Sequence, residues 1–126
     1  MNTKKILIIE DEAAILYSLK ARLTVEGINT LTASSAEEGF EILKKEKPDV
    51  ILLDIILPQM DGLSFMKQLK NDKSYQDIPI IIMSNLNKKD KIEKSLKLGA
   101  KDYIVKSEFN LESLINKIKD VITHVS

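Results

Sequence analysis

The sequence predicts an α/β domain with a doubly wound parallel sheet, and two observations carry this prediction. Five short apolar stretches alternate along the chain with five segments whose apolar residues fall at helical spacing. The stretch at residues 50–53 is apolar without alternation, which is typical of a parallel strand covered by helices on both faces. The 126 residues are enough for one full hydrophobic core, so we expect residues 1–126 to form a single domain.

Strands and helices are predicted in a regular order. Gly27 and Gly99 each end a predicted helix, because glycine readily adopts the positive φ of a helix C-terminus. Ser35 and Glu38 form a capping box at the start of the second helix, and Asn87 is expected to cap the fourth. The predicted strands cover residues 5–9, 28–32, 50–53, 78–83 and 102–105, and a helix follows each of them.

Composition excludes several kinds of chemistry. The absence of cysteine excludes disulfides, thiolate metal sites and cysteine nucleophiles. The one histidine, His124, is expected at the surface. With one histidine and no cysteine, any metal site must use oxygen ligands, which favours Mg²⁺, Mn²⁺ or Ca²⁺ over Zn²⁺. Nineteen basic and nineteen acidic residues cancel, so no global charge points to nucleic acid or to a membrane surface. The sequence contains no pattern of a signal peptide or membrane span, so we expect a soluble cytoplasmic protein.

The phenylalanines are expected in the core: Phe40, Phe65 and Phe109.

Polar and charged residues stand at the carboxyl ends of four predicted strands. Glu10 and Asp11 follow the first strand, and the later strands end in turn at Asp54, Ser84 and Lys106. Right-handed crossovers place these strand ends at one edge of a parallel sheet, where ligands bind in such folds. Two carboxylates ~4 Å apart at an effective dielectric of about 20 repel by about 4 kcal/mol. We therefore expect a divalent cation such as Mg²⁺ among them.

Nucleotide-binding folds of this class differ at the turn after the first strand. They place glycines there, so that backbone amides can bind phosphate. Here the turn reads Glu10-Asp11-Glu12, and its charge repels phosphate unless a metal ion bridges the two. Nucleotide binding is therefore disfavoured.

The order of these residues resembles the receiver domain of two-component response regulators over almost the whole chain. The matching features are the acidic pair after the first strand, Asp54 within a D-x-x-L-P-x-M-D-G segment, Ser84, Tyr103 and Lys106. The resemblance implies a flavodoxin-like fold with strand order 2-1-3-4-5. It also implies a signalling switch that catalyses only its own phosphorylation and dephosphorylation, not a metabolic enzyme.

The resemblance assigns chemistry to the residues at the sheet edge. Asp54 would accept a phosphoryl group from a phosphohistidine on a histidine kinase or histidine phosphotransfer protein. Mg²⁺ would be held by Asp11, Asp54 and the backbone carbonyl of Ile56, with Glu10 acting through a water. The ion and Lys106 would neutralise charge on the phosphoryl oxygens.

The same resemblance assigns a switch to Ser84 and Tyr103. The Ser84 hydroxyl would donate a hydrogen bond to a phosphoryl oxygen, and Tyr103 would turn inward behind it. These changes would alter the face formed by the fourth helix, fifth strand and fifth helix, which would then signal to an unidentified downstream protein. No direct contact of this domain with nucleic acid is expected.

Two residues at the edge depart from the family pattern. Ser107 follows Lys106 where many receivers have proline. A cis peptide without proline costs about 2.5 to 4 kcal/mol, so we expect a trans bond there. Asn85 follows Ser84 where the family usually has a small residue, and it is expected to crowd the entrance to the phosphoryl site.

Two further positions tune hydrolysis of the phosphoryl group in this family, and both are apolar here. They are Ile56 and Leu86. Neither can orient a water molecule, so we expect phospho-Asp54 to hydrolyse slowly.

The fourth predicted helix is strongly basic. A solvated face explains this most simply, and docking of an acidic partner or weak homodimerisation through this region is the alternative. Its lysines are Lys88, Lys89, Lys91, Lys94 and Lys97.

The sequence is also compatible with other functional assignments. Ser107 and Asn85 leave room for a receiver-like interaction module that no longer uses phosphate. A metal-dependent phosphohydrolase is less favoured, because Ile55 and Ile56 stand where a second catalytic acid would be needed. The chain ends about where the fifth helix should, so we expect a stand-alone protein or a fragment of a longer regulator.

Overall fold

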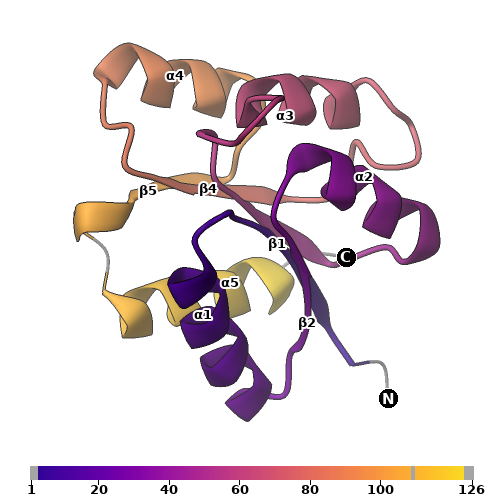
Figure 1. The fold of residues 1–126 in the computed structure, drawn as a ribbon, viewed down its shortest axis with the longest axis vertical. Coiled ribbons are helices and arrows are strands. Elements are labelled where there is room, and N and C mark those ends of the chain that lie inside the picture. Colours follow the sequence, from indigo (N-terminus) through magenta and orange to yellow (C-terminus); the bar gives the residue numbers. More distant parts are fainter. Residues whose placement is uncertain (1–2, 109, 124–126) are drawn as a thin grey trace.

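The structure is a computed structural model that describes residues 3–108 and 110–123 (Figure 1). Its five parallel strands have the order β2-β1-β3-β4-β5, which confirms the predicted fold class and strand order. The strands are β1 (Lys5–Ile9), β2 (Asn29–Ala33), β3 (Val50–Leu53), β4 (Ile80–Ser84) and β5 (Asp102–Val105). The helices are α1 (Ala13–Val25), α2 (Ala36–Lys45), α3 (Gly62–Lys70), α4 (Lys89–Lys97) and α5 (Leu111–Thr123). Phe109 and His124, predicted in the core and at the surface, lie outside the described residues.

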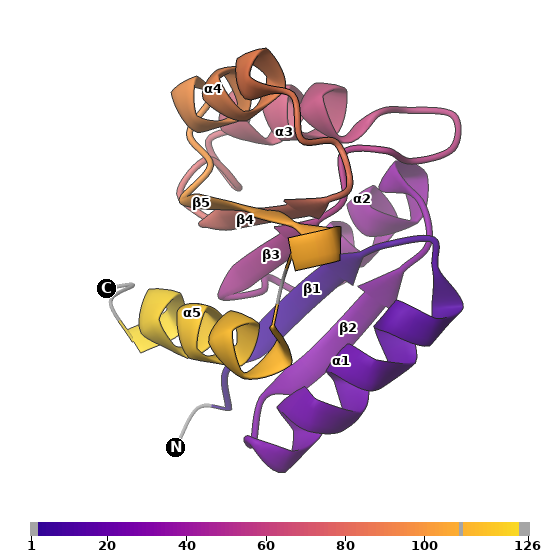
Figure 2. The same cartoon turned by 90° about the vertical axis from the view of Figure 1, so that its left-hand side faces the viewer.

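Helices cover both faces of the sheet. α1 and α5 lie against one face, and α2, α3 and α4 lie in a row against the other (Figures 1 and 2). Along β1, Ile6 and Ile8 pack toward α1 and α5, whereas Leu7 and Ile9 pack toward α2 and α3 with Phe65. Burial on both faces explains why the central strands show no polar alternation. Within the described ranges, no helix has the length and apolar character that crossing a membrane requires.

The register of the sheet brings two strand ends to the same level. Ile9 at the end of β1 pairs with Leu53 at the end of β3 on one side and with Ala33 of β2 on the other. The next residues continue this alignment: the Glu10 amide donates to the Ala33 carbonyl (2.9 Å) and the Asp54 amide to the Ile9 carbonyl (3.0 Å). Glu10 and Asp54 therefore leave the sheet side by side.

Most predicted helix boundaries are confirmed by their caps. Gly27 and Gly99 follow α1 and α4 with φ values of 79° and 113°, the left-handed conformation expected after a helix. The Ser35 hydroxyl accepts a hydrogen bond from the Glu38 amide (3.1 Å), as the capping box predicts.

The predicted cap of α4 is wrong by one residue. The N-cap position is Lys88, not Asn87, and no side chain caps this end. The amides of Lys91 and Ile92 both donate to the Lys88 carbonyl, so the first turn begins too late for Asn87 to reach a free amide. Asp90 supplies the negative charge that favours a helix N-terminus instead.

β4 begins later than its apolar pattern predicts. Ile78 and Pro79 are buried but precede the strand, which starts at Ile80. Proline has no amide hydrogen to donate, yet its carbonyl accepts a hydrogen bond from the Ile51 amide (2.9 Å). Pro79 thus aligns β4 with β3 from just outside the strand.

Candidate functional site

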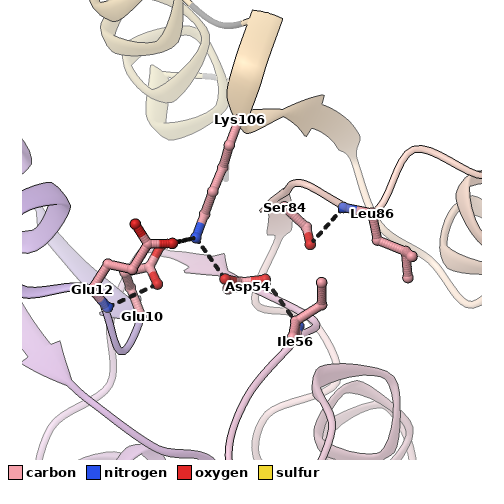
Figure 3. A network of polar contacts seen from close by, with 7 residues as sticks. All are labelled: Glu10, Glu12, Asp54, Ile56, Ser84, Leu86 and Lys106. Carbon is pink, nitrogen blue, oxygen red and sulfur yellow. Dashed lines mark hydrogen bonds and ion pairs between the residues drawn. The ribbon is translucent and has the colours of Figure 1, made fainter.

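Lys106 lies among three carboxylates at the carboxyl edge of the sheet (Figure 3). Its Nζ is 2.5 Å from Glu10 Oε1, 2.7 Å from Asp54 Oδ2 and 3.0 Å from Glu12 Oε1. Oxygens of the three acids lie within 4.8 Å of one another. Glu10 and Asp54 are 1% and 5% exposed, whereas the Glu12 side chain is 55% exposed. The chain thus concentrates negative charge around one buried ammonium group.

Burial and hydrogen bonds act against each other on the pKa values of this cluster. Burial raises the pKa of Glu10, although hydrogen bonds from Lys106 and the Glu12 amide oppose the shift. Burial alone would lower the pKa of Lys106, but its hydrogen bonds to Asp54, Glu10 and Glu12 outweigh burial and raise it. Lys106 therefore stays protonated at neutral pH and provides a permanent positive charge beside Asp54.

A tight loop after β3 fixes the Asp54 carboxylate. The Ile56 amide donates to Asp54 Oδ1 (2.9 Å), so both carboxylate oxygens have a donor. The loop turns back through Gln59, whose φ is 68°, and the Gly62 amide donates to the Ile55 carbonyl (2.9 Å). A Cβ on Gly62 would lie 2.5 Å from Ile55 Cα and 2.7 Å from the Asp54 carbonyl oxygen. Only glycine therefore lets α3 start this close to Asp54.

Leu86 connects the end of β4 to the side chain of Tyr103 on β5. Its amide donates to the Ser84 hydroxyl (3.3 Å), and its carbonyl accepts a hydrogen bond from the Tyr103 hydroxyl. Ser84 is fully buried as the last residue of β4, and it approaches Asp54 from a different strand than Lys106 does (Figure 3). Burial raises the pKa of Tyr103, the hydrogen bond with Ser84 opposes this, and the negative charge of Asp54 adds to it.

The structure brings together three of the residues that the sequence singles out at strand ends: Glu10, Asp54 and Lys106. Asp11 is exposed and is not one of the three clustered carboxylates; its role as a metal ligand stays a prediction. Glu12 takes the third place in the cluster and was not predicted to do so. Its only signal is its position two residues after Glu10, at the same strand end.

The residues that depart from the family pattern leave the local backbone regular. No cis peptide occurs in the ranges 3–108 and 110–123, so the Lys106–Ser107 bond is trans as expected. Asn85 is exposed, and its effect on access to the site stays a prediction.

The donor set fits a hard divalent cation. Three clustered carboxylates supply the oxygen ligands that Mg²⁺ prefers, and two of them belong to side chains that are almost fully buried. Lys106 balances only part of their negative charge, so a divalent ion would lower the remaining repulsion. The backbone of Ile56 contacts Asp54 through its amide, whereas the predicted role of its carbonyl as a ligand is untested.

Comparison with known proteins identifies relatives over almost the whole chain. The family model described as "Response regulator receiver domain" matches residues 6–119. The transcriptional regulatory protein KdpE of Staphylococcus aureus is 40% identical over 91% of this chain and 48% of the relative. A probable transcriptional regulator of Porphyridium aerugineum is 36% identical over 99% of this chain and 50% of the relative. The chain thus spans about half the length of the curated relatives it matches.

Solved structures with the same fold include two with more than 30% identity. A two-component response regulator from Clostridium difficile gives a TM-score of 0.89 at 33% identity, covering 97% of this chain and 98% of the other. A CheY-like response regulator receiver domain protein from Methanospirillum hungatei gives 0.89 at 32% identity, covering 97% and 95%.

Proposed function

This chain belongs to the response regulator receiver domain family, and we propose that Asp54 is its phosphoacceptor in two-component signalling. The single observation that carries this proposal is the state of the Asp54 side chain. It is a buried carboxylate at a strand end, held at 2.7 Å by the ammonium group of Lys106 and accompanied by two further acids. A purely structural role for the Asp54 carboxylate does not explain why two further acids lie beside it, whereas a functional site does.

The proposed reaction is transfer of a phosphoryl group from a phosphohistidine. A carboxylate oxygen of Asp54 attacks phosphorus, the bond from phosphorus to the imidazole nitrogen breaks, and an acyl phosphate forms. The imidazole nitrogen leaves with the electron pair of the broken bond. Lys106 keeps its proton throughout and offsets the charge that spreads over the phosphoryl oxygens.

We propose that Mg²⁺ assists this reaction. Asp11, Asp54 and the Ile56 carbonyl would hold the ion, Glu10 would act through a water, and Glu12 adds negative charge at the rim. When bound, the ion supplies further neutralisation of the transferring group. The chain's own contribution is to fix Asp54 through Lys106 and the Ile56 amide before the donor arrives.

The proposed signal passes through Leu86 to the face made by α4, β5 and α5. The Ser84 hydroxyl accepts from the Leu86 amide and would donate its proton to a phosphoryl oxygen, so a shift of Ser84 toward the phosphoryl group would move the Leu86 backbone with it. Because the Leu86 carbonyl also accepts from Tyr103, this movement would reach β5. A pocket of about 230 Å³ between β5 and α5 offers a downstream protein a place to bind beside Tyr103.

The proposed partners are a histidine kinase or histidine phosphotransfer protein and a downstream protein. We propose that the chain acts in the cytoplasm, where its lack of cysteine suits reducing conditions. Its catalysis is confined to its own phosphorylation and dephosphorylation, and it makes no direct contact with nucleic acid.

The experiment is intact-mass measurement after incubation with acetyl phosphate in Mg²⁺ or in EDTA. We expect one phosphoryl adduct that forms only with Mg²⁺ and is lost in Asp54→Asn. Asp90→Asn is the matched control, because Asp90 is an exposed carboxylate on α4. It should be modified like the wild type.

Two results would contradict this proposal. An adduct that persists in Asp54→Asn would move the acceptor to another residue. If neither acetyl phosphate nor phosphoramidate gives an adduct and Mg²⁺ does not bind, the chain is a receiver-like interaction module that works without phosphate.

A further inference from the structure

The chain is neutral overall, but its charges are segregated along the sequence. Residues 10–60 contain ten acidic and five basic residues, whereas residues 61–101 contain nine lysines and five acidic residues. On the sheet face that carries three helices, α2 and α4 stand at opposite ends of the row with α3 between them (Figures 1 and 2). α2 itself carries three acidic and two basic residues, whereas α4 carries four lysines and two acidic residues, so the α2 end of this face is the more acidic and the α4 end is basic.

The acidic end carries a groove of about 780 Å³ between α2 and the segment that runs from α3 into the following loop. Phe40, Leu69 and Tyr75 give it an apolar lining. Four acids also line it, against one lysine, Lys44: they are Glu37, Glu38, Glu41 and Asp72. Such a groove suits an apolar side chain that is flanked by positive charges.

The basic end presents such a side chain. Leu96 on α4 is 44% exposed, one of few large apolar side chains at the described surface. Lys97 is adjacent to it and Lys89 lies about two turns earlier on the same helix. Both lysines are exposed, and neither forms an ion pair within the described ranges.

We propose that α4 of one copy docks into the acidic groove of a second copy, with Leu96 as the apolar anchor. Both halves of the contact are present in every molecule. α4 and the groove are different surfaces, so the contact is heterologous and propagates as an open chain of molecules rather than closing as a symmetric pair. Its strength depends on ionic strength, because exposed charges flank the anchor.

A second copy is favoured over nucleic acid as the occupant for a physical reason. Single-stranded nucleic acid is bound by basic grooves that contain aromatic side chains, and α4 contains neither aromatic residues nor arginine. The groove, in turn, combines aromatic residues with carboxylates, which repel phosphate. The basic surface of α4 with its apolar anchor and the acidic groove with its aromatic lining are therefore complementary to each other.

The first test is sedimentation of the wild type over a wide concentration range. We expect the weight-average mass to rise above 14.2 kDa with concentration at low ionic strength. The rise should shrink at high ionic strength, since the Debye length falls from about 30 Å at 0.01 M to about 3 Å at 1 M. A mass that stays at the monomer value in both buffers overturns the proposal.

The second test separates the two surfaces. Glu37→Gln with Glu41→Gln neutralises these two carboxylates of the groove, and Lys89→Gln with Lys97→Gln neutralises the two lysines that flank Leu96 on α4. All four residues are exposed, so both variants should fold. Each variant alone should be monomeric. An equimolar mixture should reach twice the monomer mass and grow no further, because only one usable contact remains.

A charge-matched control tests the apolar anchor. Leu96→Ser added to the groove variant leaves every charge in place, and we expect it to abolish dimerisation in the mixture. If this mixture still dimerises, attraction between oppositely charged variants explains the effect and the proposed docking is wrong. If the groove variant alone still self-associates like the wild type, the contact is α4 against α4. None of these readouts depends on phosphorylation.

Discussion

The hydroxyl of Tyr103 donates a hydrogen bond to the backbone carbonyl of Leu86. This contact joins β5 to the loop after β4, and the Leu86 amide continues it to the Ser84 hydroxyl. The hydroxyl end of Tyr103 is therefore directed toward that loop. The communication path proposed above rests on one residue that contributes only backbone groups.

Tyr103→Phe removes this hydrogen bond and keeps the ring. We expect the free energy of unfolding to fall by about 1 kcal/mol, within the usual 0.5 to 1.5 kcal/mol for a hydrogen bond. Urea unfolding measures it. Tyr17→Phe is the control, because Tyr17 is 73% exposed and should change stability little. Equal effects of the two substitutions would contradict the expected role of the contact.

Gly62→Ala should disturb the loop that fixes Asp54. The added Cβ meets backbone atoms of Ile55 and Asp54, which cannot rotate away. We expect a loss of about 1 to 3 kcal/mol in unfolding free energy and slower phosphoryl uptake from acetyl phosphate. Gly27→Ala is the control: its positive φ costs stability, but nothing lies within 4 Å of its added Cβ and uptake should be normal.

Lys106→Met should make the thermal stability of the protein depend on a divalent cation. Without the ammonium group, Glu10 and Asp54 lose their buried partner, which costs about 3 to 5 kcal/mol. Mg²⁺ should restore part of this loss, as measured by thermal unfolding in Mg²⁺ and in EDTA. Lys117→Met removes an exposed pair with Asp102 and should cost less than about 1 kcal/mol. A Mg²⁺ response no larger in Lys106→Met than in Lys117→Met would argue against a metal at this edge.

Acid should weaken the contact between α1 and α5. Lys119 lowers the pKa of Glu26, and Arg22 lowers the pKa of Glu112. A carboxylate with a lowered folded-state pKa stabilises the fold above its ordinary pKa of about 4.3, and this contribution is lost as pH falls through the lowered value. We expect urea midpoints to fall less steeply below about pH 4.3 in Glu26→Gln with Glu112→Gln than in the wild type. Parallel curves would show that the network does not contribute.

Hydrolysis of phospho-Asp54 should be slow and should accelerate in Ile56→Asn. Ile56 is 53% exposed and Leu86 is half-buried, and neither side chain can hold an attacking water. An asparagine amide at position 56 can do so. Loss of the adduct after removal of the phosphodonor, followed by intact mass, measures the rate. A wild-type lifetime of seconds, made longer by the asparagine, would refute this expectation.

Topology made much of the site predictable from sequence. Glu10, Asp54 and Lys106 come together because parallel strands end at one edge, and that requires only that the strands be placed correctly. Glu12 could not be predicted in the same way. Its contact with Lys106 depends on how far a side chain in a turn reaches.

Boundaries and surface networks were less predictable. The start of α4 at Lys89 depends on loop geometry that shifts the first turn past Asn87. The ion pairs that join Arg22 and Glu26 of the α1 region to Glu112 and Lys119 of α5 involve residues far apart in sequence. No local pattern indicates that their side chains meet.

The pairing of Ile9 with Leu53 has a consequence for how this chain tolerates changes in length. A single-residue insertion within β1 or β3 would reverse which face each following side chain meets, and would separate Glu10 from Asp54. The turns at the opposite edge, such as residues 26–28 and 46–49, carry no such constraint on the site. Among natural and engineered variants, insertions and deletions should therefore accumulate in those turns, while the two strands that end at the acidic cluster keep a fixed length.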